Sequence, residues 1–408
     1  TLNGATIQGG TSTGSVPYGA GIYAQCNSGE SVSLTIELIG ENTITGYYGI
    51  YVNAEISADS NGTDASLTIT GENNGSLEVS GSNHGIFVKS GTGNASLNIK
   101  NVAVTSSTNG NSAAGVYVMS SPFATDSPNI SLSVDGGSLT TSASEGNDGI
   151  QFYVGSSEAT GATTSLTVSD NAIVRANGGI KASRVDEPTP SGTGIVFDGN
   201  KGTVYGSVEL QKDLEIKSGE TLTIPEGSTL NTNNNLTNNG TIVNTGGALN
   251  GEPGGTGKIE TTPTIDTQPE SQTVTAGETA EFSVTATGEN LSYQWQKITD
   301  NGSSWMDITG ETNASYTIAT TTTYMNDTQY RCVVSNSAGS VESDAATLTV
   351  NAIPTYTITV QTDGHGTASA SSTTATAGKQ ITLTATSNSG YRFARWEVVL
   401  GDITITNN

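Results

Sequence analysis

The chain has 408 residues, only 13% of them charged, and its 38 acidic side chains against 14 Lys and Arg give a net charge of −24. Nucleic acids and anionic membranes are bound by clustered Lys and Arg, so we expect neither as a partner. No apolar run is long enough to span a bilayer, and the two cysteines, Cys26 and Cys332, are too far apart for metal-type spacing. The length is sufficient for two to four domains.

The first half of the chain repeats two short phrases. GIYA at 21–24 returns as GIYV at 49–52, GIFV at 85–88 and GVYV at 115–118, and Gly149 and Gly179 open looser copies. Between these copies lies an alternating phrase, which reads SLTI, SLTI, SLNI, SLSV and SLTV at 33–36, 66–69, 96–99, 131–134 and 165–168. A third short alternating segment follows each of them, so each repeat is predicted to hold three short strands.

Strands of four or five residues cannot bury an apolar face alone, so they must stack on identical strands above and below. We therefore predict that residues 1–258 form a parallel β-helix with three strands per coil. It is expected to be right-handed, because parallel crossovers almost always are. The repeated Gly is expected to permit a tight corner before its strand. The Asn cluster at 231–239 is expected to form structural side-chain ladders.

This segment, with phrases such as SGETLTIPEGSTL at 218–230, resembles the pectin-lyase-like β-helices of bacterial surface proteins and adhesins. The resemblance implies a fold and does not imply one activity.

A Gly- and Pro-rich linker at 246–263 leads to a segment at 262–352 that resembles an immunoglobulin-like domain. Trp295 suits the core Trp of that fold, and Tyr330 lies two residues before Cys332, as in the tyrosine corner. Val284 stands where the partner cysteine would lie. We therefore expect Cys332 to be a buried, unpaired and unreactive thiol.

The last segment, 353–408, resembles the divergent internalin B-type repeat of bacterial surface proteins. The resemblance is carried by YTITV at 356–360, GHGTASAS at 364–371, and AGKQITLTATSNSGYRFARWEV at 377–398. It implies that Tyr391, Phe393 and Trp396 form a hydrophobic core. A further strand normally follows in that family, so the repeat is expected to be truncated here.

One set of side chains is a candidate ligand-binding surface. Tyr23, Tyr51, Phe87 and Tyr117 each follow a core Ile or Val, so alternation turns them outward. Stacked from coil to coil, they would form an aromatic stripe suited to sugars or proteins. The alternative is that loops cover the stripe and make it a second packing layer.

Candidate chemistry is sparse. KASRVDEP at 181–188 gathers Lys181, Arg184, Asp186 and Glu187, and is the best catalytic candidate, against the alternative of a solvated loop. His84 and the His365 of DGHG are each expected to lie in an exposed turn.

One acidic loop is a candidate metal site. DSNGTD at 59–64 offers Asp59, Asn61 and Asp64 as calcium ligands, but it lacks the ordered spacing of an EF-hand, so a polar loop is the simpler reading. We expect no obligatory cofactor, and calcium remains the alternative.

These observations favour a non-catalytic, extracellular protein of the bacterial cell surface. It would be an adhesin that binds glycans or host or matrix proteins through the β-helix, monomeric, with the other modules as spacers. The rival hypothesis is a polysaccharide lyase or glycoside hydrolase that uses a β-helix groove. A third is a passive surface stalk.

Overall fold

The computed structural model describes residues 1–9, 19–26, 30–54, 63–71, 75–111, 113–121, 127–155, 161–298, 304–399 and 401. In these residues the elements are β-strands, apart from a single 3-10 turn at Thr323–Met325, so the protein is all-β. The chain divides into two compact units, which are described separately below. Unit 1 comprises Thr1–Thr264, Gly288–Leu291 and Ser335–Ser340, and unit 2 comprises Ile265–Thr287, Ser292–Val334 and Val341–Asn408.

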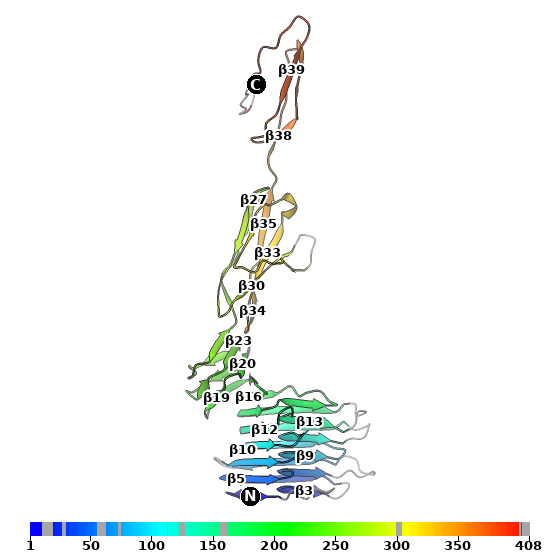
Figure 1. The fold of residues 1–408 in the computed structure, drawn as a ribbon, viewed down its shortest axis with the longest axis vertical. Coiled ribbons are helices and arrows are strands. Elements are labelled where there is room, and N and C mark those ends of the chain that lie inside the picture. Colours follow the sequence, from blue (N-terminus) through cyan, green and yellow to red (C-terminus); the bar gives the residue numbers. More distant parts are fainter. Residues whose placement is uncertain are drawn as a thin grey trace. The chain divides into compact units, whose positions relative to one another are not determined.

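Unit 1 contains a long sheet, built largely from the alternating phrases. Its successive strands are β4 (Val32–Ile39), β7 (Ala65–Gly71), β10 (Ala95–Thr108), β12 (Asn129–Ser142) and β14 (Thr163–Ala176), and each pairs with the next in parallel (Figure 1). Register places equivalent residues in line, since Leu34, Leu67, Leu97, Leu132 and Leu166 are successive partners. Full burial of one such Leu contributes about 1.5–3 kcal/mol.

The GIYV phrases form a second, short sheet. Its strands are β3 (Ile22–Cys26), β6 (Ile50–Ala54), β9 (Ile86–Ser90), β11 (Val116–Ser120), β13 (Ile150–Val154) and β15 (Ile180–Ser183). All neighbours are parallel. Ile50, Ile86 and Val116 are fully buried and share one hydrophobic cluster with the long sheet.

The second and third segments of each repeat share one hydrogen-bonded sheet. In β10, β12 and β14 they run together as single strands of 14 residues each. Each long strand has residues with left-handed backbone at its middle, for example Asn101 (φ 56°), Gly136 (φ 67°) and Asp170 (φ 50°). The three predicted segments are therefore present, but they are distributed over two sheets in this part of the chain.

Gly179 has the positive φ, 94°, that a tight corner requires, but the glycines of the closer copies have a different cause from the one expected. Gly49, Gly85 and Gly115 do not have the positive φ of a tight left-handed corner. A Cβ on Gly85 would instead lie 2.6 Å from the carbonyl oxygen of Gly115 and 2.2 Å from Ser106 Oγ. The phrase begins with Gly because successive layers approach too closely there for any side chain.

The parallel stacking is interrupted once, at a hairpin. β16 (Ser191–Asp198) pairs in parallel with β14 but antiparallel with β17 (Lys201–Tyr205). Adjacent residues of β16 face opposite sides, so Val196 belongs to the cluster described above, whereas Ile195 and Phe197 belong to a second one. β16 is thus a wall between two hydrophobic cores.

Beyond the hairpin the repeats are shorter. β17 is followed in parallel by β20 (Thr221–Pro225), β23 (Thr241–Thr245) and β25 (Lys258–Thr261). One rung of the expected Asn ladder is present, since Asn250 Nδ2 donates to Asn231 Oδ1 at 2.7 Å. Other Asn side chains bond backbone carbonyls of the neighbouring layer: Asn235 Nδ2 donates to Leu210 O at 2.9 Å, and Asn238 Nδ2 to Lys258 O at 2.9 Å. Their role in the structure is to hold turns together.

Unit 2 contains an immunoglobulin-like arrangement of strands. One sheet has the order β27 (Gln272–Thr275), β35 (Ala346–Asn351), β33 (Thr328–Asn336), β30 (Ser292–Ile298) and β31 (Met306–Asp307), and β28 (Ala280–Ser283) pairs with β32 (Ser315–Ile318). Trp295 is fully buried, and its Nε1 donates to Asn313 O at 2.9 Å. Cys332 is free and fully buried, and burial raises the pKa of its thiol to about 11. It is therefore protonated and unreactive at neutral pH.

The tail forms two separate two-stranded ladders. β36 (Thr355–Thr357) pairs with β38 (Thr374–Thr376), and β37 (Gly366–Ala370) pairs with β39 (Leu383–Ser387), both antiparallel. The expected aromatic core is wrong for Tyr391 and Phe393, which are 54% and 50% exposed. Neither residue lies on a strand, since β39 ends at Ser387, so no neighbouring strand or second layer covers these rings. His365 stacks on Tyr391, with ring centroids 4.2 Å apart.

Candidate functional site

Four aromatic rings of the short sheet lie in a row on the face turned away from the core. Register pairs Tyr23 with Tyr51, Tyr51 with Phe87, and Phe87 with Tyr117. The ring centroids are 5.3, 4.7 and 5.0 Å apart along the row. Because parallel strands lie about 4.8 Å apart, in-register pairing is enough to stack these rings.

The row is not the exposed stripe that alternation predicts. Tyr23 is 38% exposed and Tyr117 is half-buried, but Tyr51 and Phe87 are only 8% and 7% exposed. The ring of Tyr48 covers them, with centroids 4.8 Å from Tyr51 and 5.6 Å from Phe87. The prediction of outward exposure is therefore wrong for the two middle members, which form part of a second packing layer.

The ring of His84 also covers the aromatic row, so the expectation that His84 is exposed is wrong. The side chain is 7% exposed, and its ring centroid lies 5.2 Å from Phe87 and 4.7 Å from Tyr117. The backbone N–H of Ala114 lies 3.0 Å from Nδ1, and the carbonyl oxygen of Ala114 lies 3.4 Å from the same atom. Burial lowers the pKa of His84 to about 4, so the imidazole is neutral at physiological pH.

The row continues at the Tyr117 end. The ring of Tyr153 lies 6.2 Å from that of Tyr117, and Arg184 Cζ lies 5.4 Å from the centre of the Tyr153 ring. Arg184 also donates from Nη1 to Gly155 O at 2.6 Å. Burial raises the pKa of the Tyr117 phenol, and the positive charge of Arg184 opposes that shift. This end presents half-buried rings beside an exposed guanidinium.

The predicted catalytic cluster is divided by the fold. Lys181 Nζ lies 3.7 Å from Glu187 Oε1, with both side chains 55% exposed, so the pair stabilises the fold little. Arg184 is directed to Tyr153 and Gly155 instead. Asp186 is exposed, and its backbone oxygen accepts a bond from the Thr164 hydroxyl. The four residues do not converge on one point as an acid–base set requires.

The predicted calcium ligands are only partly within the described residues. Asp59 and Asn61 lie outside them. Asp64 Oδ1 accepts the backbone N–H of Asn94 at 2.6 Å, so this carboxylate joins two successive turns. Among the residues that the structure describes, no group of three or more His, Cys, Asp or Glu side chains is placed to hold a metal ion.

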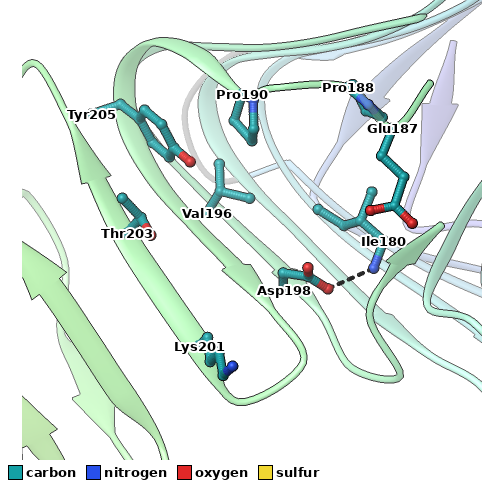
Figure 2. A pocket seen from close by; sticks show the side chains of 9 residues that line it. All are labelled: Ile180, Glu187, Pro188, Pro190, Val196, Asp198, Lys201, Thr203 and Tyr205. Atoms are coloured by element: carbon teal, nitrogen blue, oxygen red, sulfur yellow. Dashed lines mark hydrogen bonds between the residues drawn. The ribbon is translucent and has the colours of Figure 1, made fainter. Parts of the chain in front are cut away.

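A pocket of ≈ 210 Å³ opens beside the hairpin of β16 and β17 (Figure 2). Ile180, Pro188, Pro190 and Val196 line its apolar side. Glu187, Asp198, Lys201, Thr203 and Tyr205 line its polar side. Figure 2 shows that Asp198 reaches the backbone of Ile180, where its Oδ1 accepts the N–H at 2.7 Å.

Two families match the C-terminal part of the chain. Residues 356–408 match the divergent InlB B-repeat domain, as the tail phrases predict. Residues 264–352 match a domain of unknown function, DUF8696. The comparison with curated proteins finds no match.

Solved structures that resemble a part of the chain contain immunoglobulin domains. A DIP-gamma IG1+IG2 structure is 19% identical over 24% of this chain and 51% of its own, with a TM-score of 0.19. A chimeric titin Z1Z2 structure is 23% identical over 23% of this chain and 97% of its own, with a TM-score of 0.19. The four N-terminal Ig domains of Dscam1 give 25% identity over 24% of this chain and 23% of theirs, with a TM-score of 0.20. The matched segment thus spans about half of the DIP-gamma chain.

Sequence reasoning missed the residues that come from turns and from the hairpin. Tyr48 and His84 reach the aromatic row from turns that precede their strands, where alternation gives no information. The hairpin had a readable signal, since Gly199-Asn200 between two alternating segments is a typical two-residue turn. That signal would have placed Lys201, Thr203 and Tyr205 on one face of β17.

Proposed function

We propose that this chain belongs to a bacterial cell-surface adhesin. The observation that carries the proposal is the match of residues 356–408 to the divergent InlB B-repeat, a domain of bacterial surface proteins. In the described residues, no helix is long and apolar enough to cross a membrane. In this proposal the immunoglobulin-like segment at 262–352 and the repeat at 353–408 are spacers, and residues 1–258 bind the glycan or protein ligand.

We further propose that residues 1–258 form a right-handed parallel β-helix of the pectin-lyase type. Support comes from strand neighbours that are parallel from β4 to β16 and from β17 to β25, and from the in-register Leu positions of the long sheet. Right-handed crossovers are the rule for parallel connections. Such a body is rigid because each layer bonds to the next along its whole length.

The binding surface in this proposal is the open end of the aromatic row. Tyr23, Tyr51, Phe87 and Tyr117 keep their place in it, but Tyr51 and Phe87 support the row from within, since they are buried. Tyr117 and Tyr153 place half-buried rings, and Arg184 a cation, at one end of the row. Half-buried rings with a polar neighbour suit glycans and protein loops, because they lose little side-chain entropy on contact.

The experiment is a binding screen with the full chain against a glycan array and immobilised collagen, fibronectin and laminin. Tyr153→Ala and Arg184→Ala should weaken binding about tenfold or more, whereas Tyr324→Ala, at a side chain 98% exposed in unit 2, should not. Loss of binding in all three variants alike would contradict the proposed surface. No binding to any probe would favour the passive stalk.

An activity assay on the same protein distinguishes an adhesin from an enzyme. Pectins and other uronans are incubated with calcium or with chelator, and unsaturated uronate absorbance and new reducing ends are followed. Product that depends on calcium and is lost in Arg184→Ala would establish the lyase in place of the adhesin. The position of Arg184, bonded to Gly155 and stacked on Tyr153, leads us to expect no product.

A further inference from the structure

The pocket beside the hairpin exists because the parallel stack stops there. β15 is the last strand of the short sheet, so no further strand of that sheet lies beside it. The chain then crosses through Pro188 and Pro190 to β16 and turns back as β17. Ile180 and Val196 are 5% and 3% exposed, so they form a nearly closed apolar floor. The hollow is left between this floor and the side chains of β17 (Figure 2).

The polar side of the pocket is ordered before any ligand arrives. Lys201, Thr203 and Tyr205 alternate along β17, so all three face the pocket. Asp198 is held by the N–H of Ile180 at 2.7 Å. Burial raises the pKa of the Tyr205 phenol above its ordinary value. A fixed carboxylate, a phenol and a hydroxyl are thus held around one small volume.

The lining contains two acidic side chains and one basic side chain, and each acid lies near a basic partner. Glu187 and Asp198 are acidic, Lys201 is basic, and Lys181 lies 3.7 Å from Glu187. Lys181 lies outside the lining and pairs with Glu187, and Asp198 has Lys201 as its register partner, so each lining acid has a basic group beside it, while the net charge of −24 opposes anions from a distance. The pocket is therefore electrostatically suited to a neutral ligand with many hydrogen-bonding groups.

The size limits the ligand to one ring. Pockets for drug-sized ligands measure about 300–1,000 Å³, and this one measures ≈ 210 Å³. An apolar floor with an aromatic wall receives the C–H face of a ring, and carboxylate and ammonium groups bond strongly to hydroxyls. A neutral sugar ring has this combination of an apolar face and a hydroxyl rim.

We propose that the pocket lined by Glu187, Asp198, Lys201 and Tyr205 binds a single neutral sugar ring, such as the terminal unit of a glycan. The ring's C–H face lies on Tyr205 and Pro190, and its hydroxyls donate to Glu187 and Asp198 and accept from Lys201. This site is separate from the row that ends at Tyr153 and Arg184, and it does not depend on the adhesin proposal.

The test uses the full chain and four methyl glycosides, those of glucose, galactose, mannose and N-acetylglucosamine. Methyl glucuronide is the anionic probe and methylamine the cationic one. Binding is followed by saturation-transfer NMR and calorimetry. We expect at least one neutral glycoside to bind with a Kd near 1 mM, about −4 kcal/mol, and both charged probes to bind at least tenfold more weakly.

Variants locate the site. Tyr205→Ala should weaken binding about tenfold or more, and Glu187→Gln should weaken it several-fold without affecting folding, because this side chain is 55% exposed. Tyr324→Ala is the matched tyrosine control and should bind as the parent does. The thermal unfolding midpoint of each variant shows whether it is folded.

Each remaining outcome has one meaning. Binding that is unchanged in both Tyr205→Ala and Glu187→Gln but lost in Tyr153→Ala would place the sugar on the aromatic row, which would overturn this site and support the adhesin surface. Preferential binding of a charged probe, or no binding of any neutral glycoside at 20-fold the expected Kd, would overturn the proposal. Monosaccharide binding at the pocket with no glycan or matrix adhesion would leave this site standing and reject the adhesin surface.

Discussion

Similar aromatic side chains are buried in the repeats of unit 1 and exposed in the tail of unit 2. Tyr51 and Phe87 are 8% and 7% exposed, whereas Tyr391 and Phe393 are 54% and 50% exposed. All four residues are Tyr or Phe, so residue type does not explain the difference in exposure. In the stack each ring has a ring from the next layer beside it, whereas Tyr391 and Phe393 lie beyond β39 and outside any strand. Burial of an aromatic ring here depends on repetition of the strand that carries it.

The largest effect that tests this comparison is a cavity inside the stack. Leu132 is fully buried in β12, between β10 and β14. Leu132→Ala should lower the free energy of unfolding by about 2–5 kcal/mol, because rigid neighbouring layers cannot collapse into the space. Chemical denaturation followed by circular dichroism measures it. A loss below about 1 kcal/mol would show that the stack is loosely packed and would break the comparison.

The next effect is a pH dependence of the aromatic cover. His84 has a folded pKa of about 4, below the ordinary 6.5, so the unfolded chain binds a proton more readily between these values. Its contribution is therefore complete above pH 6.5 and is lost as the pH falls towards 4, by roughly 3 kcal/mol in all.

The measurement for His84 is the free energy of unfolding at several pH values, for the parent and for His84→Gln. Gln keeps an acceptor for the Ala114 N–H but has no titrating group in this range. The parent should lose more stability than the variant on acidification. Parallel pH curves would mean that His84 is solvated in solution, and the covered row would then resemble the tail.

A smaller effect should come from the repeated glycine. Gly85→Ala places a Cβ against Gly115 O and Ser106 Oγ, and overpacking of this kind costs about 1–3 kcal/mol. Gly254→Ala is the matched control, since the nearest atom to its added Cβ would be Leu236 O at 3.8 Å and its φ is not positive. Thermal unfolding of both variants compares them. Equal midpoints would show that the layers can separate locally, as strands in the tail can.

The smallest effect is expected in the tail. Tyr391→Ala should change the stability by less than about 0.5 kcal/mol, because the ring is half-exposed and stacks mainly on His365. The check is the same denaturation experiment, with tyrosine fluorescence as a second probe. A loss of 2 kcal/mol or more would show that the tail buries this ring in solution, as the family resemblance implies.

Much of unit 1 could be predicted from its repeats, because one pattern determines several layers at once. The alternating phrases gave the strands of the long sheet, and the position of Phe87 two residues after Gly85 gave the row of rings. Exposure could not be predicted in the same way. It depends on Tyr48 and His84, which reach the row from turns of differing length.

The catalytic candidates show a different limit. Lys181 and Arg184 are three residues apart, yet one contacts Glu187 and the other contacts Tyr153 and Gly155. The backbone of Arg184 is left-handed, with φ at 64°, which turns the chain between them. Positions 181 and 184 are also an odd number of residues apart, so strand alternation already favours opposite faces, whereas the left-handed backbone of Arg184 could not be predicted from composition.

The reversal at β16 and β17 also bears on how such a chain can change length. Val196 closes the core of the long repeats, while Ile195 and Phe197 open the next one, so the fully buried residues on the two sides of β16 belong to different clusters. A duplication or deletion of one whole repeat before residue 150 would leave every residue of the hairpin pocket and the strands after it with the same neighbours. The height of the stack can therefore vary between descendants of this gene while the pocket is inherited intact.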